Sequence, residues 1–441
     1  MHEEDNALLF FMHARRSPRL IKSRGDLMMQ VLSLFSGCGG MDLGFEGGFK
    51  VRACCVNRNM HPGWKIADDG EWVKLPRTKF TTVFANDIRK DARTAWVNYF
   101  SKRGASPDVY KVQSVVDLVK SAKSGVEGVF PSKVDVVTGG FPCQDFSVAG
   151  KRLGFDSVTG HDGAKIENGS PTIENRGHLY MWMRDVVSLT QPKVFVAENV
   201  KGLVSLADAK QIIENDFRSI GDGGYLVVDA RVLFAADYGV PQSRERVIFL
   251  GFKRSALTKK AVKELSNLSI RPDFDPYPVK THSLTPDSSQ VPYVNLKEAF
   301  SDLPEPDKAE DVEQSVFSRA KYMGAHCQGQ KEISLERIGP TIRSEHHGNI
   351  EFRRLSKEHG GVIAGELKHG MKERRLTVRE CARIQTFPDD FQFVFKNEFG
   401  SVNSSQAYQI IGNAVPPLLG FNIAMRLQEN WKRYFAETPK A

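Results

Sequence analysis

The sequence lacks the features that would place the chain in a membrane, in an oxidising compartment or around structural zinc. No apolar run is long enough to cross a bilayer. The 6 cysteines include no Cys-x-x-Cys pair, the spacing that structural zinc sites use. A disulfide framework would be unusual in a chain of 441 residues. We therefore expect reduced thiols, no bound metal, no membrane association and a cytoplasmic location.

The sequence also lacks a strong excess of either charge. Lys and Arg number 61 against 53 Asp and Glu, which gives a formal net charge of +8. This modest positive balance suits a polyanionic partner without requiring one. With 41% hydrophobic and 26% charged residues, the composition is that of a globular protein, and the length of 441 residues is enough for one large domain and a smaller one.

Residues 1–30 contain no convincing pattern and no signal-peptide cleavage site, so we expect a poorly ordered leader there. Short apolar runs then alternate with helical patterns, such as the one that follows Asp91 and the one from Leu179 to Leu189. This alternation predicts an α/β fold with a doubly wound, mostly parallel, Rossmann-like sheet. The expected strands are 31–35, 82–85, 134–138, 194–197, 225–233 and 247–252.

The alternating pattern stops after residue 252 and resumes near Leu376. Residues 253–372 are rich in Pro, Ser, Asp and Lys, which indicates a smaller inserted domain. Thr377 and Glu380 then form a plausible capping box, and Pro416 opens a further helix towards Trp431. We therefore expect a catalytic domain over 31–252, with an insertion at about 46–81, that residues 373–441 complete.

A glycine-rich turn, Ser36 to Gly40, directly follows the first expected strand. Glycines at the carboxyl end of a strand let the backbone approach a ligand, although a tight turn without a ligand would look the same. Asp87 ends the next expected strand. Its carboxylate could accept hydrogen bonds from ribose hydroxyls or favour the N-terminus of the following helix.

Cys143 is the best candidate for a nucleophile. It follows a buried strand, two glycines and Pro142, which fixes the backbone just before the thiol. A lone cysteine is more often a small buried apolar residue. Here the turn favours display of the sulfur in the crevice where parallel sheets bind ligands.

Six motifs in one order carry a resemblance to a known family. They are Phe-Ser-Gly-Cys-Gly-Gly (35–40), Gly-Gly-Phe-Pro-Cys-Gln (139–144), Glu-Asn-Val (198–200), Gln-Ser-Arg-Glu-Arg (242–246), Arg-Leu-Thr-Val-Arg-Glu-Cys-Ala-Arg-Ile-Gln-Thr-Phe-Pro (375–388) and Ile-Gly-Asn-Ala-Val-Pro-Pro (411–417). The chain resembles the cytosine-5 DNA methyltransferases of prokaryotic restriction–modification systems. The resemblance runs from about residue 31 to 424, apart from the inserted domain.

The resemblance implies a mechanism. S-adenosyl-L-methionine would supply the methyl group and leave as S-adenosyl-L-homocysteine, and the target cytosine would be flipped out of double-stranded DNA. Cys143 would attack ring carbon 6, which makes ring carbon 5 nucleophilic. A protonated Glu198 would contact ring nitrogen 3. Arg244 and Arg246 would contact the base or its phosphate, although an exposed basic strand edge is an alternative for one of them.

The resemblance also implies binding residues. The expected cofactor contacts are Phe35, Gly37, Cys38, Gly39, Gly40, Asp87, Ile88, Pro142, Leu179, Asn413 and Val415. The expected substrate contacts are Phe141, Gln144, Asn199, Gln242, Arg343 and Arg353.

Four segments depart from the family pattern or extend it. The residue that would contact the adenine ring stays unassigned, with Gln113 and Ser114 as candidates. Residues 147–176 correspond to the family's active-site loop, and 253–372 to its target-recognition domain. The insertion at 46–81 contains Cys54, Cys55, His61 and Trp64 at a spacing that is poor for a metal, so we expect a surface elaboration.

Three other functions are weighed against this one. The related RNA branch shares the catalytic residues, but the large inserted domain favours DNA. A non-catalytic DNA-binding relative would not need Cys143, Glu198 and both arginines. A nicotinamide oxidoreductase does not fit the glycine turn. We expect a monomer that shares its DNA site with a cognate restriction endonuclease without forming a stable complex.

The nucleophile assignment makes a first prediction. Cys143→Ser should abolish methyl transfer and leave cofactor affinity largely intact, because only the bond to the base is lost. Methyl incorporation and calorimetric binding measured on the same preparation would test this. Substantial residual turnover would contradict the assignment.

Overall fold

The computed structural model describes residues 28–142, 179–205, 208–221, 223–344 and 348–436 of the chain. The predictions for Cys143, Gln144, the loop 147–176 and most of the leader lie outside these residues.

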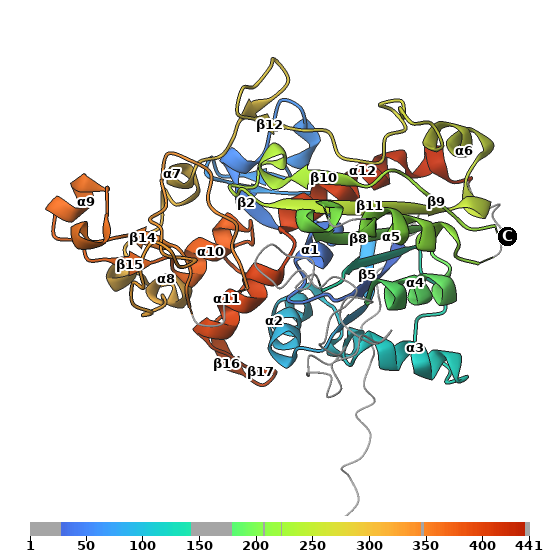
Figure 1. Cartoon of the computed structure of the whole chain (residues 1–441), viewed down its shortest axis with the longest axis horizontal. Helices are drawn as coiled ribbons and strands as arrows, with labels where there is room; N and C mark the ends of the chain where they lie inside the picture. The colour runs from blue at the N-terminus through green and yellow to red at the C-terminus, as the bar shows by residue number, and fades with distance from the viewer. Residues whose placement is uncertain (1–27, 143–178, 206–207, 222, 345–347, 437–441) are drawn as a thin grey trace, which may run out of the picture.

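An eight-stranded sheet forms the centre of the protein (Figure 1), and seven of its strands follow the order β10-β11-β8-β7-β1-β5-β6. Neighbours from β8 to β6 are parallel, whereas β11 pairs antiparallel with β8, β10 and the eighth strand, β9. The strands are β1 (Met29–Leu34), β5 (Phe80–Asp87), β6 (Tyr110–Val112), β7 (Val136–Gly140), β8 (Val194–Val200), β9 (Tyr225–Val227), β10 (Arg231–Phe234) and β11 (Glu245–Lys253).

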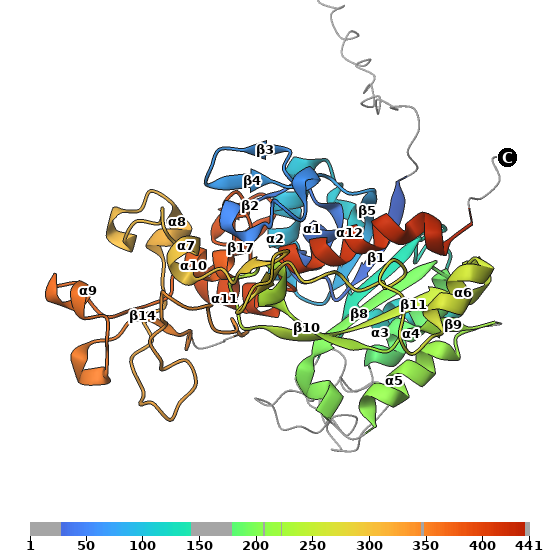
Figure 2. The same cartoon turned by 90° about the horizontal axis from the view of Figure 1, so that it is seen from above.

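Helices cover both faces of this sheet (Figure 2). One face carries α1 (Gly40–Glu46), α2 (Lys90–Phe100) and α12 (Pro417–Tyr434), and the other carries α3 (Val115–Lys123), α4 (Leu179–Thr190) and α5 (Ala209–Arg218). Successive strand residues point to opposite faces. Val194 and Val196 therefore belong to one apolar core and Phe195 to the other. The expected doubly wound, mostly parallel fold is confirmed.

One expected strand is wrong as a single element. Residues 225–233 form two strands, β9 and β10, which pair with different parts of β11. The chain leaves the ladder between them because the Ala230 amide donates to the Glu214 carboxylate (3.0 Å) rather than to β11. The apolar run in the sequence predicts that these residues are buried, but it does not show that the Ala230 amide bonds to Glu214 instead of to β11.

The insertion after α1 also differs from expectation. It forms a three-stranded antiparallel sheet of β2 (Lys50–Arg52), β4 (Trp72–Lys74) and β3 (Ala67–Asp68). Val51 and Val73 are buried in the main core, and the Trp64 ring packs edge-on against Phe421 of α12 (4.9 Å between centroids). The insertion is thus part of the core rather than a surface elaboration. Within the described ranges, no group of three His, Cys, Asp or Glu residues is placed to hold a metal.

The C-terminal segment packs into the same apolar core as β1 and β5. It contains α10 (Val378–Ile384), the hairpin β16 (Phe395–Asn397) and β17 (Gly400–Val402), then α11 (Ser404–Asn413) and α12. The predicted capping box is confirmed: Thr377 Oγ accepts from the Glu380 amide, and the Glu380 carboxylate accepts from the Thr377 amide. The helical segment Ser404–Tyr434 is long and apolar enough to cross a membrane. However, 83% of its most apolar 18-residue stretch is buried inside the protein, as in the core of a globular protein.

Most of the inserted segment lies at one end of the protein (Figure 1). Its first helix, α6 (Lys259–Leu265), instead contacts α12. The remaining elements are short: β12 (His282–Ser283), β13 (Val291–Pro292), α7 (Leu296–Ala299), α8 (Val312–Ser315), β14 (Phe352–Arg354), α9 (Ala364–Lys368) and β15 (Arg374–Arg375).

Candidate active site

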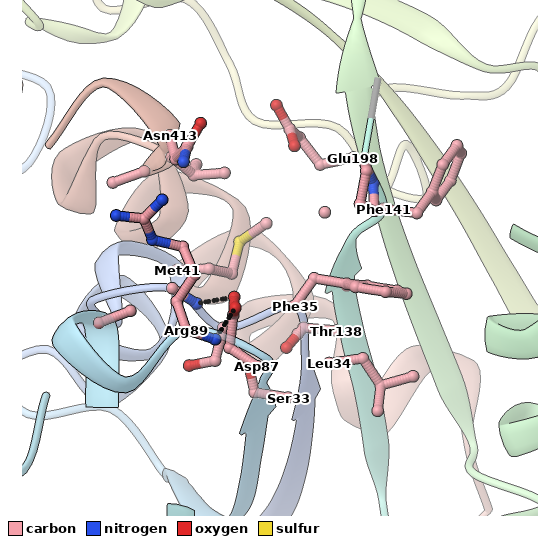
Figure 3. A pocket seen from close by; sticks show the side chains of 18 of the residues that line it. Ser33, Leu34, Phe35, Met41, Asp87, Arg89, Thr138, Phe141, Glu198 and Asn413 are labelled. Carbon is pink, nitrogen blue, oxygen red and sulfur yellow. Dashed lines mark hydrogen bonds between the residues drawn. The ribbon is translucent and has the colours of Figure 1, made fainter. Parts of the chain in front are cut away.

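A cavity of about 300 Å³ lies at the carboxyl ends of β1, β5, β7 and β8. The chain adds β5 on one side of β1 and later β7 on the other, so this is the point where the strand order reverses. Open α/β sheets bind their ligands at such a point. Figure 3 shows side chains from these strand ends and from the C-terminal segment facing the same space.

Most of the expected site residues that the structure describes line this one cavity. They are Phe35, Gly37, Asp87, Ile88, Phe141, Pro142, Leu179, Glu198, Asn199, Arg244, Arg246, Asn413 and Val415. Ser114, one of the two candidates left open for adenine, also lines it. The fold therefore brings together motifs that lie hundreds of residues apart in the sequence.

The glycine turn divides into a cavity wall and a packing contact. Gly37 lines the cavity, and a Cβ there would meet no atom within 4 Å. A Cβ on Gly39 would clash with the Trp96 ring, and one on Gly40 with the backbone of Val415. The Cys38 thiol is fully buried and donates to the Ile410 carbonyl (3.4 Å), and its burial raises the pKa of the thiol. These three residues hold the turn in place rather than line the cavity.

Asp42 is a structural residue that the sequence analysis missed. Its buried carboxylate accepts hydrogen bonds from the Ser33 and Ser36 hydroxyls (2.5 Å each) and from the Trp96 indole (2.7 Å). Burial raises the pKa of Asp42, and the three hydrogen bonds oppose that shift. An acidic residue within an otherwise apolar helix start was the available signal.

Asp87 presents its carboxylate to the cavity beside the glycine turn. It accepts from the Gly37 amide (3.0 Å) and the Arg89 amide (3.0 Å), as Figure 3 shows. Burial raises the pKa of Asp87, and these two hydrogen bonds oppose the shift. Asp87 is the last residue of β5 and only Ile88 and Arg89 separate it from α2, so its position is compatible with both of its expected roles.

Glu198 and Arg246 form an ion pair at the other side of the cavity. Arg246 Nε lies 2.7 Å from Glu198 Oε1. A Cβ on Gly140 would approach Glu198 Oε2 to 2.8 Å, so the glycine leaves room for this carboxyl. Asn199 Nδ2 donates to the Phe141 carbonyl (3.2 Å). Asn199 thereby positions the segment that leads to residue 143.

Arg244 has a different environment from Arg246, although both line the cavity. The residue is 1% exposed, and its guanidinium donates to the carbonyls of Ile342 (3.0 Å), Gly412 (3.1 Å) and Ala414 (2.9 Å). These hydrogen bonds join the residue just before β11 to the inserted segment and to the end of α11. Arg244 is therefore a clamp between three parts of the chain.

Gln242 supports the same junction. Its amide donates to the Ile384 carbonyl (3.2 Å) and to Gln385 Oε1 (2.9 Å), and it accepts from the Ile342 amide (3.1 Å). The side chain is fully buried and lies outside the cavity wall. These contacts give Gln242 a structural role.

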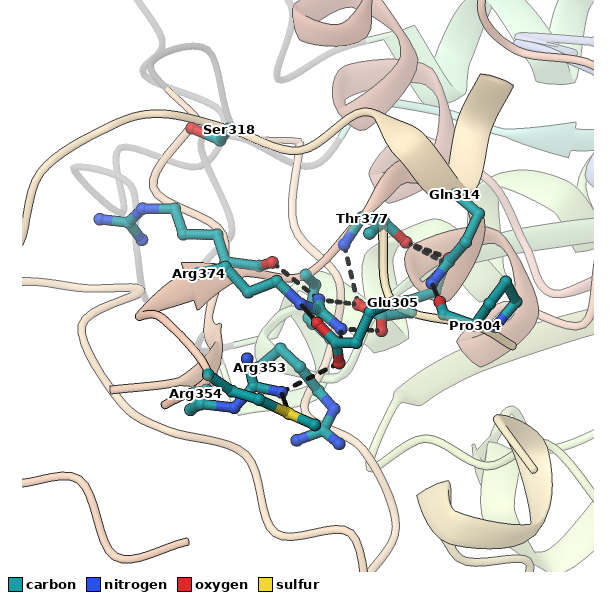
Figure 4. A network of polar contacts seen from close by, with 12 residues as sticks. Pro304, Glu305, Gln314, Ser318, Arg353, Arg354, Arg374 and Thr377 are labelled. Carbon is teal, nitrogen blue, oxygen red and sulfur yellow. Dashed lines mark hydrogen bonds and ion pairs between the residues drawn. The ribbon is translucent and has the colours of Figure 1, made fainter. Parts of the chain in front are cut away.

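The two arginines expected to contact DNA have carboxylate partners within the chain. Arg343 pairs with Glu351 (3.2 Å) and Arg353 with Glu366 (2.7 Å). Arg353 belongs to the polar network of Figure 4, in which Glu305 bridges Arg354 and Arg374. Burial opposes ionisation of Glu305, but the two guanidinium groups lower its pKa to about 2. DNA contact by Arg343 and Arg353 stays a prediction.

The contrast between the two cavity arginines yields a second prediction. Arg244→Lys should lower the free energy of unfolding by about 2 kcal/mol or more, because a lysine has one nitrogen where Nη1 and Nη2 of Arg244 reach buried carbonyls of different segments. Arg246→Lys is the matched control, since it keeps the charge beside Glu198, and it should cost clearly less. Urea unfolding followed by circular dichroism would measure both. Equal losses would contradict the clamp.

The model of the C-5 cytosine-specific DNA methylase family matches residues 29–429. The chain is 30% identical to the Type II methyltransferase M.BsuRI of Bacillus subtilis, over 96% of this chain and 86% of the relative. It is 32% identical to the Type II methyltransferase M.BspRI of Lysinibacillus sphaericus, over 90% and 81% respectively.

Solved structures agree at the level of the fold. The Entamoeba histolytica methyltransferase EhMeth matches with a TM-score of 0.52 and 13% identity, over 92% of this chain and 98% of that chain. A mutant of Spodoptera frugiperda DNMT2 matches with a TM-score of 0.51 and 16% identity, over 91% and 99%. Because the family model spans nearly the whole described chain, the protein belongs to the C-5 cytosine-specific DNA methylases and is a DNA cytosine-5 methyltransferase.

Proposed function

We propose that this DNA cytosine-5 methyltransferase uses S-adenosyl-L-methionine to methylate a cytosine that it flips out of duplex DNA, with Cys143 as the nucleophile. One observation supports this most strongly. A single cavity has the glycine turn and Asp87 on one side and Glu198, Arg246 and the segment leading to Cys143 on the other.

The volume of the cavity and the polar groups in its wall support binding of this cofactor. The cavity volume of about 300 Å³ is in the range of small-molecule sites. Asp87 has a carboxylate that can accept from ribose hydroxyls, and the open space at Gly37 lets backbone approach the ligand. When bound, the cofactor supplies an electrophilic methyl group on a sulfonium.

The protein's own groups would prepare the base for this methyl group. Cys143 would add as a thiolate to ring carbon 6, and Glu198 would hold a proton at ring nitrogen 3, so that electron density moves to ring carbon 5. Arg246 keeps the Glu198 side chain in position (2.7 Å). Methylation at carbon 5, loss of the carbon 5 proton and release of sulfur would then restore the aromatic ring.

Asn199 and Arg244 would act through position rather than by touching the base. Asn199 holds the Phe141 carbonyl, two residues before the nucleophile. Arg244 holds the end of α11, which places Asn413 and Val415 at the cavity. Small displacements of a nucleophile cost large factors in rate, so both contacts bear on turnover.

We also propose the biological role of a modification enzyme in a restriction–modification system. The support is the similarity to relatives named Type II methyltransferases. In this role a monomer would methylate the site that a separate cognate endonuclease cleaves. The inserted segment, from 253 to 372, would provide the target-recognition domain.

Incorporation of labelled methyl groups tests the substrate and the reaction together. With methyl-labelled S-adenosyl-L-methionine, the purified chain should label duplex DNA at cytosine carbon 5 and leave unmodified transfer RNA unlabelled. The Cys143→Ser variant provides the background. Label in transfer RNA alone would overturn the proposed substrate. Genome-wide mapping of 5-methylcytosine in an expressing host would then give the recognition sequence.

A further inference from the structure

Arg89 is a cation in the cavity wall to which no motif assigned a role. It lies two residues after Asp87, at the start of α2. Figure 3 places its guanidinium on the same side of the cavity as Asn413, across from Glu198. It therefore lies on the proposed cofactor side of the site rather than on the proposed cytosine side.

The neighbours of Arg89 hold its guanidinium by one edge. Nε and Nη2 donate to the two carboxylate oxygens of Asp91 (3.1 and 2.5 Å), and Nη2 also donates to Gln409 Oε1 (2.7 Å). These contacts leave Nη1, with two N–H groups, without a hydrogen-bond partner among the described residues. The Arg89 side chain is 29% exposed, so a ligand in the cavity can reach Nη1. The contacts with Asp91 and Gln409 hold this donor in place.

The other cationic side chains in the described part of the cavity wall are differently engaged. Arg244 donates to three backbone carbonyls. Arg246 pairs with Glu198 on the opposite side. Among the cations of the described wall, Arg89 thus combines a position on the cofactor side with a guanidinium nitrogen that faces no acceptor among the described residues.

S-adenosyl-L-methionine has one anionic group, the α-carboxylate of its methionyl part. Burying a carboxylate without a partner is costly, and a guanidinium held in place in advance binds one with little loss of side-chain entropy. We propose that Arg89 Nη1 binds this carboxylate, while Asp91 and Gln409 fix the direction in which Nη1 points. The assignment rests on the proposed use of this cofactor.

The role of Asp91 follows from the same geometry. Its carboxylate occupies the Nε/Nη2 edge of Arg89, and it also accepts from the Ala92 amide in the first turn of α2 (2.9 Å). Asp91 is therefore a positioning residue. Asp91→Asn keeps one side-chain oxygen that can accept from Arg89 and removes an anion near the proposed carboxylate, so it should not weaken cofactor binding.

Calorimetry with two ligands tests the contact directly. The ligands are S-adenosyl-L-methionine and its decarboxylated analogue, which differ only in the carboxylate. Arg89→Gln should weaken the complete cofactor by about ten- to a hundredfold, as for loss of a charge-assisted hydrogen bond. It should change affinity for the decarboxylated analogue by less than about twofold. Arg93→Gln is the matched control, since it makes the same charge change on α2 outside the cavity wall, and it should change neither affinity.

Asp91→Asn separates contact from packing. It should leave affinity for S-adenosyl-L-methionine unchanged or higher, because the Nη1 donors remain. Equal weakening of both ligands by Arg89→Gln would overturn the assignment, as would no weakening of either. A loss with Asp91→Asn as large as with Arg89→Gln would also overturn it. If the unmodified chain binds neither ligand, the proposed use of this cofactor fails as well.

Discussion

The buried guanidinium of Arg244 is the contact on which the site most depends. Three carbonyls, from Ile342, Gly412 and Ala414, accept its hydrogen bonds. They belong to the inserted segment and to the last part of the chain, whereas Arg244 itself precedes β11 of the central sheet. A buried cation must be satisfied by acceptors, so these separate segments are held in one arrangement. That arrangement brings Asn413 and Val415 to the carboxyl ends of β1 and β5.

Packing between α1 and α12 also holds the two ends of the chain together. α1 and α12 cross at Gly44 and Gly420, where a Cβ on Gly44 would meet the α12 backbone at 2.6 Å (Pro417 carbonyl) and 2.7 Å (Gly420 carbonyl carbon). Such a close approach makes the first helix after the glycine turn and the last helix of the chain a single packing unit. The insertion adds Trp64 against the same helix. The walls of the site thus come from both ends of the chain.

The sequence predicted the parts of the fold that depend on periodic patterns and capping. The doubly wound sheet, the capping box at Thr377 and the last helix all follow from spacing or local chemistry. The division of 225–233 into β9 and β10 did not, because it depends on a distant carboxylate. The burial of the insertion depends on its contact with α12, which no local pattern reports.

Within the site, the order of the motifs predicted which residues lie around the cavity, but not which contacts each of them makes. Arg244 and Arg246 look equivalent in sequence, yet one is a clamp and the other an ion-pair partner. Arg89 lies outside the quoted motifs, so only the structure shows it in the cavity wall. Asp42 has its role only because Ser33, Ser36 and Trp96 converge on it in space.

Covalent capture of the base tests the central claim most directly. DNA with 5-fluorocytosine at the target position blocks loss of the group at carbon 5, so sulfur added at carbon 6 cannot leave. The account predicts a stable adduct between this DNA and Cys143 that forms only with S-adenosyl-L-methionine, survives denaturing electrophoresis and maps to that residue by mass spectrometry. Complete absence of an adduct with DNA that the protein methylates when it contains ordinary cytosine would contradict it.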